Sequence, residues 1–181
     1  GKSKLIFYTT ELPVNPFYHF AFNIPSNKFE EAFELIGKKI NLLWLDDYKS
    51  YIADFVNWKA RSFYFTDPAG NILEIIARFD LNDITEEIFS SKLIRNISEI
   101  GLVFPGDSFQ NDVNKLLQQY PLHYFAKQPP LPQFKALGDD EGLFIIVPEN
   151  RLWFSTKNKT SKIFPMEINF IQNDTLYNLE C

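Results

Sequence analysis

Short hydrophobic runs separated by turn residues dominate the first half of the chain. Residues 18–24 (YHFAFNI), 61–66 (RSFYFT) and 72–78 (ILEIIAR) are rich in aromatic and β-branched residues, and turn residues border each run. Such runs predict strands. Residues 4–9 (KLIFYT) and 40–45 (INLLWL) show the same character more loosely and predict two further strands.

One stretch between these runs has helical rather than strand periodicity. In residues 27–39 (NKFEEAFELIGKK) the apolar residues recur at i, i+3, i+4 and i+7, the spacing of one helix face; they are Phe29, Ala32, Phe33 and Ile36. Ser26 is expected to cap this helix and Gly37 to close it. The predicted order is therefore one strand, one helix and three strands.

The same order returns about 80 residues further along the chain. Residues 98–105 (SEIGLVFP) align with residues 18–25 (YHFAFNIP), and a second amphipathic helix follows over residues 109–117. Further strands are predicted at residues 134–137, 143–147 and 164–170. This repeat predicts an α+β fold of repeated βαβββ modules, which form a curved mixed sheet with a concave cleft.

Composition and charge narrow the classes of function. The 181 residues are 45% hydrophobic and 17% aromatic, enough for one sizeable core or two small ones. The net charge is −5 and no stretch clusters Lys or Arg, so nucleic acid is not an expected partner. No apolar run approaches the roughly 20 residues that span a bilayer, so no membrane association is expected.

Cysteine usage points to a reducing compartment. Cys181 is the only cysteine, which excludes an intrachain disulfide and a cysteine-based zinc site. We therefore expect a cytoplasmic protein.

Glu74 is a conspicuous residue, because it places a carboxylate in the middle of an apolar strand. A buried carboxylate must be paired, take up a proton or bind a ligand. His19 lies in the leading strand of the same module, and curved strands could bring both side chains to one concave face. An imidazole and a carboxylate there would suit Zn²⁺, Fe²⁺ or Mn²⁺. The alternative is that His19 is a hydrogen-bonded core residue, as most single histidines on strands are.

Three other residues are candidates for binding a substrate. Trp58 precedes the predicted strand that contains Tyr64, and Arg61 begins that strand. An indole and a guanidinium near a concave sheet could bind a planar or anionic molecule by stacking and bidentate hydrogen bonds. An exposed tryptophan and a solvated arginine are an equally good interpretation of this pattern.

The leading HFAFNIP, the amphipathic helix and the segment RSFYFTDPAGNILEIIAR together resemble the vicinal oxygen chelate superfamily, which includes glyoxalase I, extradiol dioxygenases and bleomycin- and fosfomycin-resistance proteins. The resemblance covers residues 17–79, and the DPAGN turn before a strand with a central Glu is its most specific part. Residues 95–171 are similar to a more divergent module, as in bacterial proteins described only as glyoxalase-like.

The resemblance implies paired modules that form a cleft over a divalent metal, which chelates two neighbouring oxygens of the substrate. His19 and Glu74 occupy the positions that often supply metal ligands in such modules. A third ligand usually comes from the leading strand of the partner module, where this chain has Glu99. A carboxylate is less typical there.

The resemblance also suggests how the chain is divided. The expected segments are a closing strand of a truncated upstream module with its connector (1–16), a first module (17–79), a linker (80–95), a second module (96–171) and a tail (172–181). Either a preceding segment is missing or a neighbouring chain completes the sheet. We therefore expect association into a homodimer.

Two functions remain open from the sequence, beside the third possibility that the protein is a scaffold whose site has decayed. One is a metal-dependent enzyme, a lyase or dioxygenase that acts on a small oxygen-rich molecule. The other is a metal-free protein that binds or sequesters a small molecule, as resistance proteins do. Several members of the superfamily bind ligands without metal, so the resemblance alone does not decide between an enzyme and a binding protein.

Overall fold

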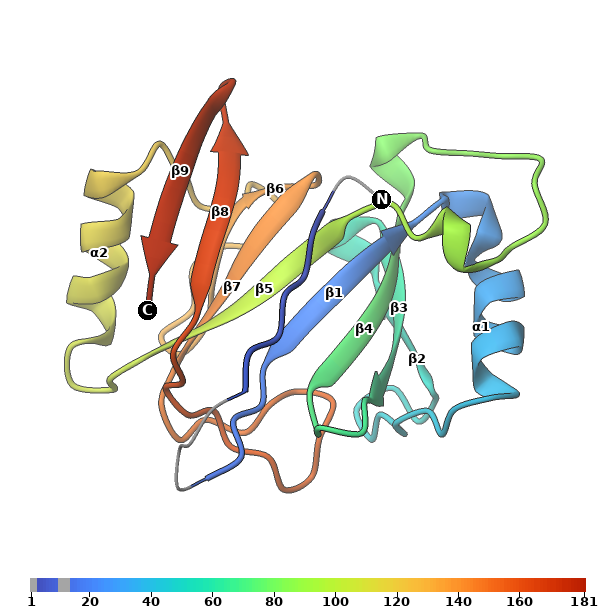
Figure 1. Cartoon of the computed structure of the whole chain (residues 1–181), viewed down its shortest axis with the longest axis horizontal. Coiled ribbons are helices and arrows are strands. Elements are labelled where there is room, and N and C mark those ends of the chain that lie inside the picture. The colour runs from blue at the N-terminus through green and yellow to red at the C-terminus, as the bar shows by residue number, and fades with distance from the viewer. Residues whose placement is uncertain (1–2, 10–13) are drawn as a thin grey trace. The chain divides into compact units, whose positions relative to one another are not determined.

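The computed structural model describes residues 3–9 and 14–181, and the chain divides into two compact units (Figure 1). Unit 1 consists of Gly1–Ile100 with Asp140–Gly142. Unit 2 consists of Gly101–Asp139 with Leu143–Cys181.

Unit 1 is a βαβββ module followed by the beginning of a further strand. Its elements are β1 (His19–Ile24), α1 (Phe29–Gly37), β2 (Ile52–Phe55), β3 (Ala60–Thr66), β4 (Ile72–Arg78) and the first half of β5 (Ile97–Phe104). Single turns of 3₁₀-helix lie between them at Ser26–Lys28, Val56–Trp58, Phe79–Leu81 and Ser91–Leu93.

The sheet of unit 1 is mixed. Its strand order is β2-β3-β4-β1-β5. β1 and β4 are parallel, whereas the pairs β2–β3, β3–β4 and β1–β5 are antiparallel. A parallel pair needs a crossover connection, and the segment containing α1, β2 and β3 provides it. This is the mixed α+β arrangement that the sequence predicts.

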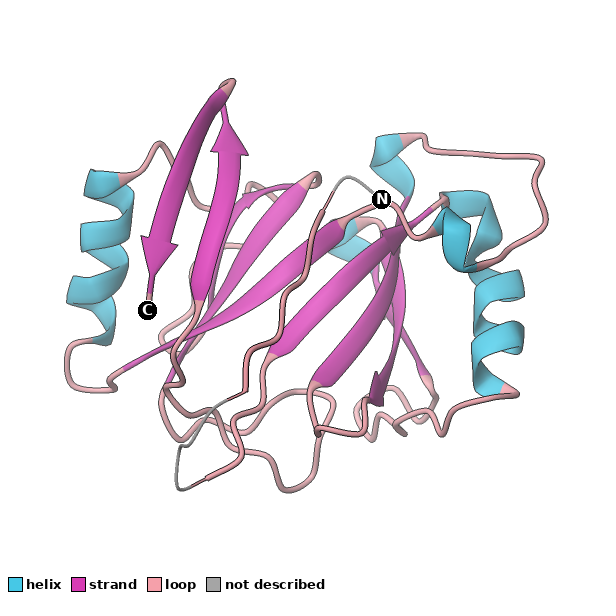
Figure 2. Cartoon of the chain, viewed as in Figure 1, coloured by secondary structure: helices cyan, strands magenta, loops and turns pink. Residues whose placement is uncertain are grey.

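Helix α1 covers one face of this sheet and buries an aromatic core against it (Figures 1 and 2). The first turn carries Glu30 and Glu31, which suit the positive end of a helix dipole. Phe29 and Phe33 of the helix both meet Phe63 of β3 edge to face. The buried residues of this core are Phe20, Ile24, Phe29, Ala32, Phe63, Phe65, Leu73, Ile75, Ala77, Phe89 and Leu93.

The DPAGN turn fixes how β1 and β4 align. The Asp67 carboxylate accepts hydrogen bonds from the backbone N–H of Asn71 (2.8 Å) and from its side-chain amide (2.7 Å). The Asn71 side chain in turn accepts a bond from the N–H of Tyr18 (2.8 Å), just before β1. Gly70 has a φ of 89°, which glycine adopts without strain. The turn therefore holds the first residues of two strands that are far apart in the chain.

A β-bulge interrupts the pairing of β1 with β5. Ala21 pairs with Glu99, but Phe22 pairs with Ile97, so Ser98 is an extra residue on β5. A bulge bends the strand and breaks the alternation of its side chains. Ser98 and Glu99 can therefore both contact the same neighbour.

Unit 2 repeats the order of elements with a different pairing. It contains the second half of β5, α2 (Phe109–Gln119), β6 (Lys135–Asp139), β7 (Gly142–Pro148), β8 (Glu167–Gln172) and β9 (Thr175–Glu180). Strand β7 lies between β5 and β6, whereas β8 and β9 form a separate two-stranded sheet. Helix α2 buries Phe109, Val113 and Leu116.

Two predicted strands are wrong. Residues 40–45 make only the isolated bridges Leu42–Phe65 and Leu45–Ser50, because β2 occupies the adjoining edge of β3. Residues 3–9 are exposed chain outside any strand, since β1 is already paired on both sides. Residues 10–13 of the expected connector lie outside the described residues. Conversely, β2 and β9 were not predicted.

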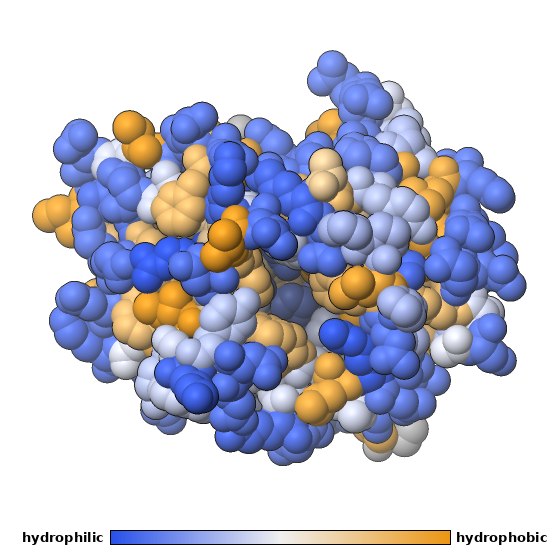
Figure 3. Space-filling model, turned by 180° about the vertical axis from the view of Figure 1, so that it is seen from behind, coloured by the Kyte–Doolittle hydropathy of each residue, from blue (hydrophilic) through white to orange (hydrophobic). Residues whose placement is uncertain are grey.

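The surface shown in Figure 3 is mainly hydrophilic, with separate hydrophobic patches between the polar side chains. Among residues 3–9 and 14–181, no helix is both long and apolar enough to cross a bilayer.

Candidate metal centre

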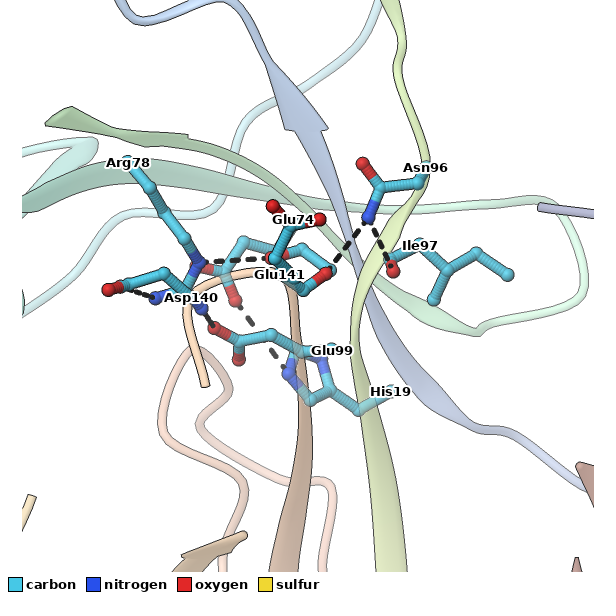
Figure 4. Close-up of polar contacts among 9 residues, drawn as sticks. His19, Glu74, Arg78, Asn96, Ile97, Glu99, Asp140 and Glu141 are labelled. Atoms are coloured by element: carbon cyan, nitrogen blue, oxygen red, sulfur yellow. Dashed lines mark hydrogen bonds and ion pairs between the residues drawn. The ribbon is translucent and has the colours of Figure 1, made fainter. Parts of the chain in front are cut away.

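Three neighbouring strands of unit 1 bring His19, Glu74 and Glu99 together on the sheet face opposite α1 (Figure 4). In the parallel pair, Ala21 of β1 lies beside Glu74 of β4, and on its other side Ala21 pairs with Glu99 of β5. His19 is two residues from Ala21 and so shares its face. The small side chain of Ala21 leaves room between the two carboxylates.

The geometry of this triad suits a shared ion. One ligand atom from each of His19, Glu74 and Glu99 lies within 4.8 Å of the other two. The Nε2 of His19 is 3.7 Å from Oε2 of Glu74. Atoms that coordinate one ion at about 2.1 Å can be up to about 4.2 Å apart. Only a small inward movement would therefore be needed for all three to bind one cation.

His19 is in the protonation state of a metal ligand. The side chain is 7% exposed, and this burial lowers the pKa of His19 to about 4, partly offset by the hydrogen bond to the Ile72 carbonyl. The imidazole is thus neutral at physiological pH, and its contact with Glu74 is not an ion pair. Nδ1 lies 3.2 Å from the Ile72 carbonyl oxygen and donates to it, which leaves the lone pair on Nε2. A backbone carbonyl that orients a histidine in this way is typical of metal sites.

Glu74 is a buried carboxyl group with incomplete hydrogen bonding. Its side chain is 2% exposed, and Oε1 makes no hydrogen bond of ordinary geometry to a described residue. Burial and the negative charge of Glu99 raise the pKa of Glu74 well above its usual value. The nearby hydroxyls of Ser62 and Tyr64 and the Arg78 guanidinium lower that pKa without cancelling the rise. The carboxyl group therefore gains from either a proton or a cation.

Glu99, besides lying in the triad, is paired with the buried Arg78. Arg78 Nη2 donates to Oε1 of Glu99, and Arg78 Nε donates to the Ser98 hydroxyl over 3.1 Å. Nη1 of the same guanidinium lies 3.6 Å from Oδ1 of Asp140, which belongs to the same unit. Burial raises the pKa of Glu99, and the positive charge of Arg78 acts against that rise.

The charges of the cluster favour a divalent cation. When ionised, the carboxylates of Glu74, Glu99 and Asp140 carry three negative charges, and the Arg78 guanidinium beside them carries one positive charge. Buried charges require compensation. The residues therefore fit a divalent metal, and one imidazole with two carboxylates suits Mn²⁺, Fe²⁺ or Zn²⁺. The described residues could hold such an ion.

The candidate substrate residues lie on different faces of the sheet. Tyr64 pairs with Glu74 across β3 and β4 and stacks with His19 at 6.4 Å between ring centroids. Trp58 is buried and packs against the Arg78 guanidinium at 5.6 Å. Tyr64 and Trp58 are therefore near the triad.

Arg61 lies on the sheet face opposite the triad, and its role in substrate binding stays a prediction. Its guanidinium pairs with Glu30 of α1 (2.5 Å) and lies over the ring of Phe29 (4.5 Å). Arg61 is three residues from Tyr64 on one strand, and side chains at odd spacing point to opposite faces.

Sequence reasoning missed Arg78, Ser98 and Asp140. Arg78 was within reach, because it is four residues after Glu74 on one strand and therefore on the same face. Ser98 could not be found, because the bulge that brings it to Arg78 depends on the pairing of two strands. Asp140 comes from a turn between β6 and β7, far from the triad in the chain.

Two surface pockets among the described residues lie away from the triad. One, of about 240 Å³, is in unit 1 and is lined by Ser3, Leu5, Phe22, Ser91, Ile94, Arg95, Asn96 and Ile97. The other, of about 230 Å³, is in unit 2 beside α2 and includes Arg151.

Comparisons with known proteins add little at the level of function. No family model matches the chain, and no curated protein matches it. A hypothetical protein, BH1468, from Bacillus halodurans C-125 is 13% identical with a TM-score of 0.43, over 81% of this chain and 98% of that one. The fosfomycin resistance protein FosX from Mesorhizobium loti is 14% identical with a TM-score of 0.25, over 74% and 91%. Similarities this low do not identify an activity.

Proposed function

We propose that unit 1 carries a divalent metal centre held by His19, Glu74 and Glu99, and that the protein is a metal-dependent enzyme for a small oxygen-rich molecule. The observation that supports this most directly is the convergence of one neutral imidazole and two buried carboxylates on adjacent strands. Carboxylate-rich ligand sets favour Mn²⁺ or Fe²⁺ over softer ions.

The chain's own residues would prepare the site for this chemistry. The Ile72 carbonyl keeps the lone pair of His19 on Nε2. The hydroxyls of Ser62 and Tyr64 lie close enough to the carboxyl of Glu74 to lower its pKa. A bound divalent ion supplies Lewis-acid activation of substrate oxygens, or oxygen activation if it is iron. Tyr64, whose pKa is raised well above its usual value by burial, stays protonated and can donate a hydrogen bond to a substrate.

Metal analysis of purified protein tests this proposal. The wild type, stripped with a chelator and reconstituted with Mn²⁺, Fe²⁺ or Zn²⁺, is expected to retain about one ion per chain. His19→Ala, Glu74→Gln and Glu99→Gln should each reduce the affinity by at least about tenfold, since each removes a ligand. Two matched controls are His123→Ala, the other histidine, and Glu34→Gln, an exposed glutamate of α1. Failure of the wild type to bind any of the three ions would exclude the proposal.

A metal-free binding protein is the second candidate, and two observations favour it. Arg78 already neutralises part of the charge on Glu99, and the 240 Å³ pocket of unit 1 offers a separate place for a small molecule. This candidate predicts that a ligand raises the melting temperature in the presence of a chelator, because binding to the folded state stabilises it. A ligand effect that disappears on chelation would exclude it.

A further inference from the structure

Arg78 is the one buried cation of the site, and the proposed chemistry does not use it. Its side chain is 0% exposed, and it contacts three groups on two different segments. These are the Glu99 carboxylate, the Ser98 hydroxyl and the Asp140 carboxylate. A fully buried guanidinium held from three sides has one orientation, so the groups that it touches are also fixed.

The bulge in β5 is what allows two consecutive residues to reach this arginine. Without the extra residue, Ser98 and Glu99 would point to opposite faces of the strand. With the extra residue, Nε of Arg78 donates to the Ser98 hydroxyl and Nη2 donates to the Glu99 carboxylate. One guanidinium therefore binds two consecutive side chains. The geometry therefore aims a single oxygen of Glu99, Oε1, at the arginine.

We propose that Arg78 is a positioning residue for the metal centre: it holds Oε1 of Glu99, so that Oε2 alone is presented to an ion shared with His19 and Glu74. Glu99 then binds through one oxygen and leaves coordination positions for a substrate. This inference rests on the proposed function, because it has no meaning unless the triad binds metal.

A competing interpretation gives effects of the opposite sign. If Arg78 merely neutralises Glu99, it competes with a metal for that carboxylate, and its positive charge repels the ion. Weakening the hold of Arg78 would then tighten metal binding. If Arg78 positions Glu99, weakening the same hold allows the carboxylate to rotate and metal binding becomes weaker.

Two variants weaken that hold without changing the charge. Ser98→Ala removes one hydroxyl that accepts a bond from Arg78, and Arg78→Lys keeps a cation but cannot bind Ser98, Glu99 and Asp140 at once. Arg61→Lys is the matched control, because it alters an arginine–glutamate pair of the same unit on the opposite face. The dissociation constant for Mn²⁺ and the visible absorption of the Co²⁺-loaded protein are measured, with circular dichroism to check folding.

We expect Ser98→Ala to weaken Mn²⁺ binding by about 2- to 10-fold, the effect of one buried hydrogen bond. Arg78→Lys should weaken it by about 10- to 100-fold and change the Co²⁺ absorption, while Arg61→Lys changes neither. If Arg78→Lys does not fold, Ser98→Ala decides alone. Unchanged or tighter binding in Ser98→Ala overturns this inference and leaves the proposed metal centre standing. A wild type that binds no metal overturns both.

Discussion

The Nε2 atom of His19 lies 3.7 Å from Oε2 of Glu74, although the two residues come from strands separated by α1, β2 and β3. This separation is too long for a hydrogen bond and suits two ligands of one ion. It depends on the parallel register of β1 and β4, in which Ala21 lies beside Glu74. The site is therefore a consequence of strand alignment, and four predictions test how it is built.

Replacing Glu74 should change how the stability of the metal-free protein depends on pH. Unfolded, Glu74 has an ordinary pKa near 4.5; folded, burial and Glu99 raise that pKa. Between these two values the folded state binds more protons, so the free energy of unfolding falls as pH rises through this window. Glu74→Gln has no carboxyl group here, so its stability does not fall in this way. Its melting temperature should be above that of the wild type at pH 7–8, and the difference between the two melting temperatures should shrink towards pH 4.5.

The measurement is the melting temperature from pH 5 to pH 8 in a chelator. For a chain of this size, about 1 kcal/mol corresponds to about 2–4 °C. Glu34→Gln, an exposed residue of α1, provides the reference curve. A constant offset between the curves of Glu74→Gln and the wild type would show that burial does not shift this carboxyl.

Asn71→Ala should weaken both stability and metal binding. The variant loses the bond that Asn71 accepts from Tyr18 and the bond that it donates to Asp67, at a cost of about 1–3 kcal/mol. Because Tyr18 directly precedes β1, His19 should become less well placed and the affinity for Mn²⁺ should fall. Chemical unfolding and titration measure the two effects, with the exposed Asn114→Ala as control. Loss of stability with full metal affinity would show that the turn does not position the site.

Arg61→Met should leave metal and ligand binding unchanged. This residue faces α1, where it pairs with Glu30 and lies over Phe29. Loss of a partly exposed ion pair and a cation–π contact should cost at most about 1–2 kcal/mol. Titration with Mn²⁺ measures the metal affinity, and a melting curve measures the stability. A weaker metal affinity would contradict the placement of this side chain.

Gly70→Ala should destabilise unit 1 by about 1 kcal/mol or more, because φ at this position is 89° and an alanine is strained there. The change would be measured by urea unfolding. Gly106→Ala is the matched control, since an added Cβ there meets no atom within 4 Å. Equal stability of both variants would show that the turn tolerates a side chain.

The sequence predicts the strands best where hydrophobic pattern and turn residues coincide. Strand β4 was predicted with its observed bounds, Ile72–Arg78, because the DPAGN turn and the apolar run mark both ends. Helix α1 was found from its periodicity. Strand β2 was missed because its residues follow a polar, acidic segment. Its pairing with β3 depends on tertiary contacts and not on a local pattern.

The triad could be proposed from the sequence but not assembled from it. His19 and Glu74 were recognised by residue type and resemblance, and Glu99 by its place in the repeat. That these residues face one another depends on the register of β1 with β4 and β5, which no local pattern specifies. The pairing of Glu99 with Arg78 additionally requires the bulge at Ser98.

The hydrogen bond between His19 and the Ile72 carbonyl closes a loop of 53 residues. Closing such a loop costs more conformational entropy than closing a shorter one. Non-local strand pairs of this kind therefore limit the rate of folding. We therefore expect β1 to dock on β4 late, after the antiparallel strands β2, β3 and β4 have formed. A metal ion could then be held by all three ligands only once folding is nearly complete, and it would slow unfolding rather than speed folding.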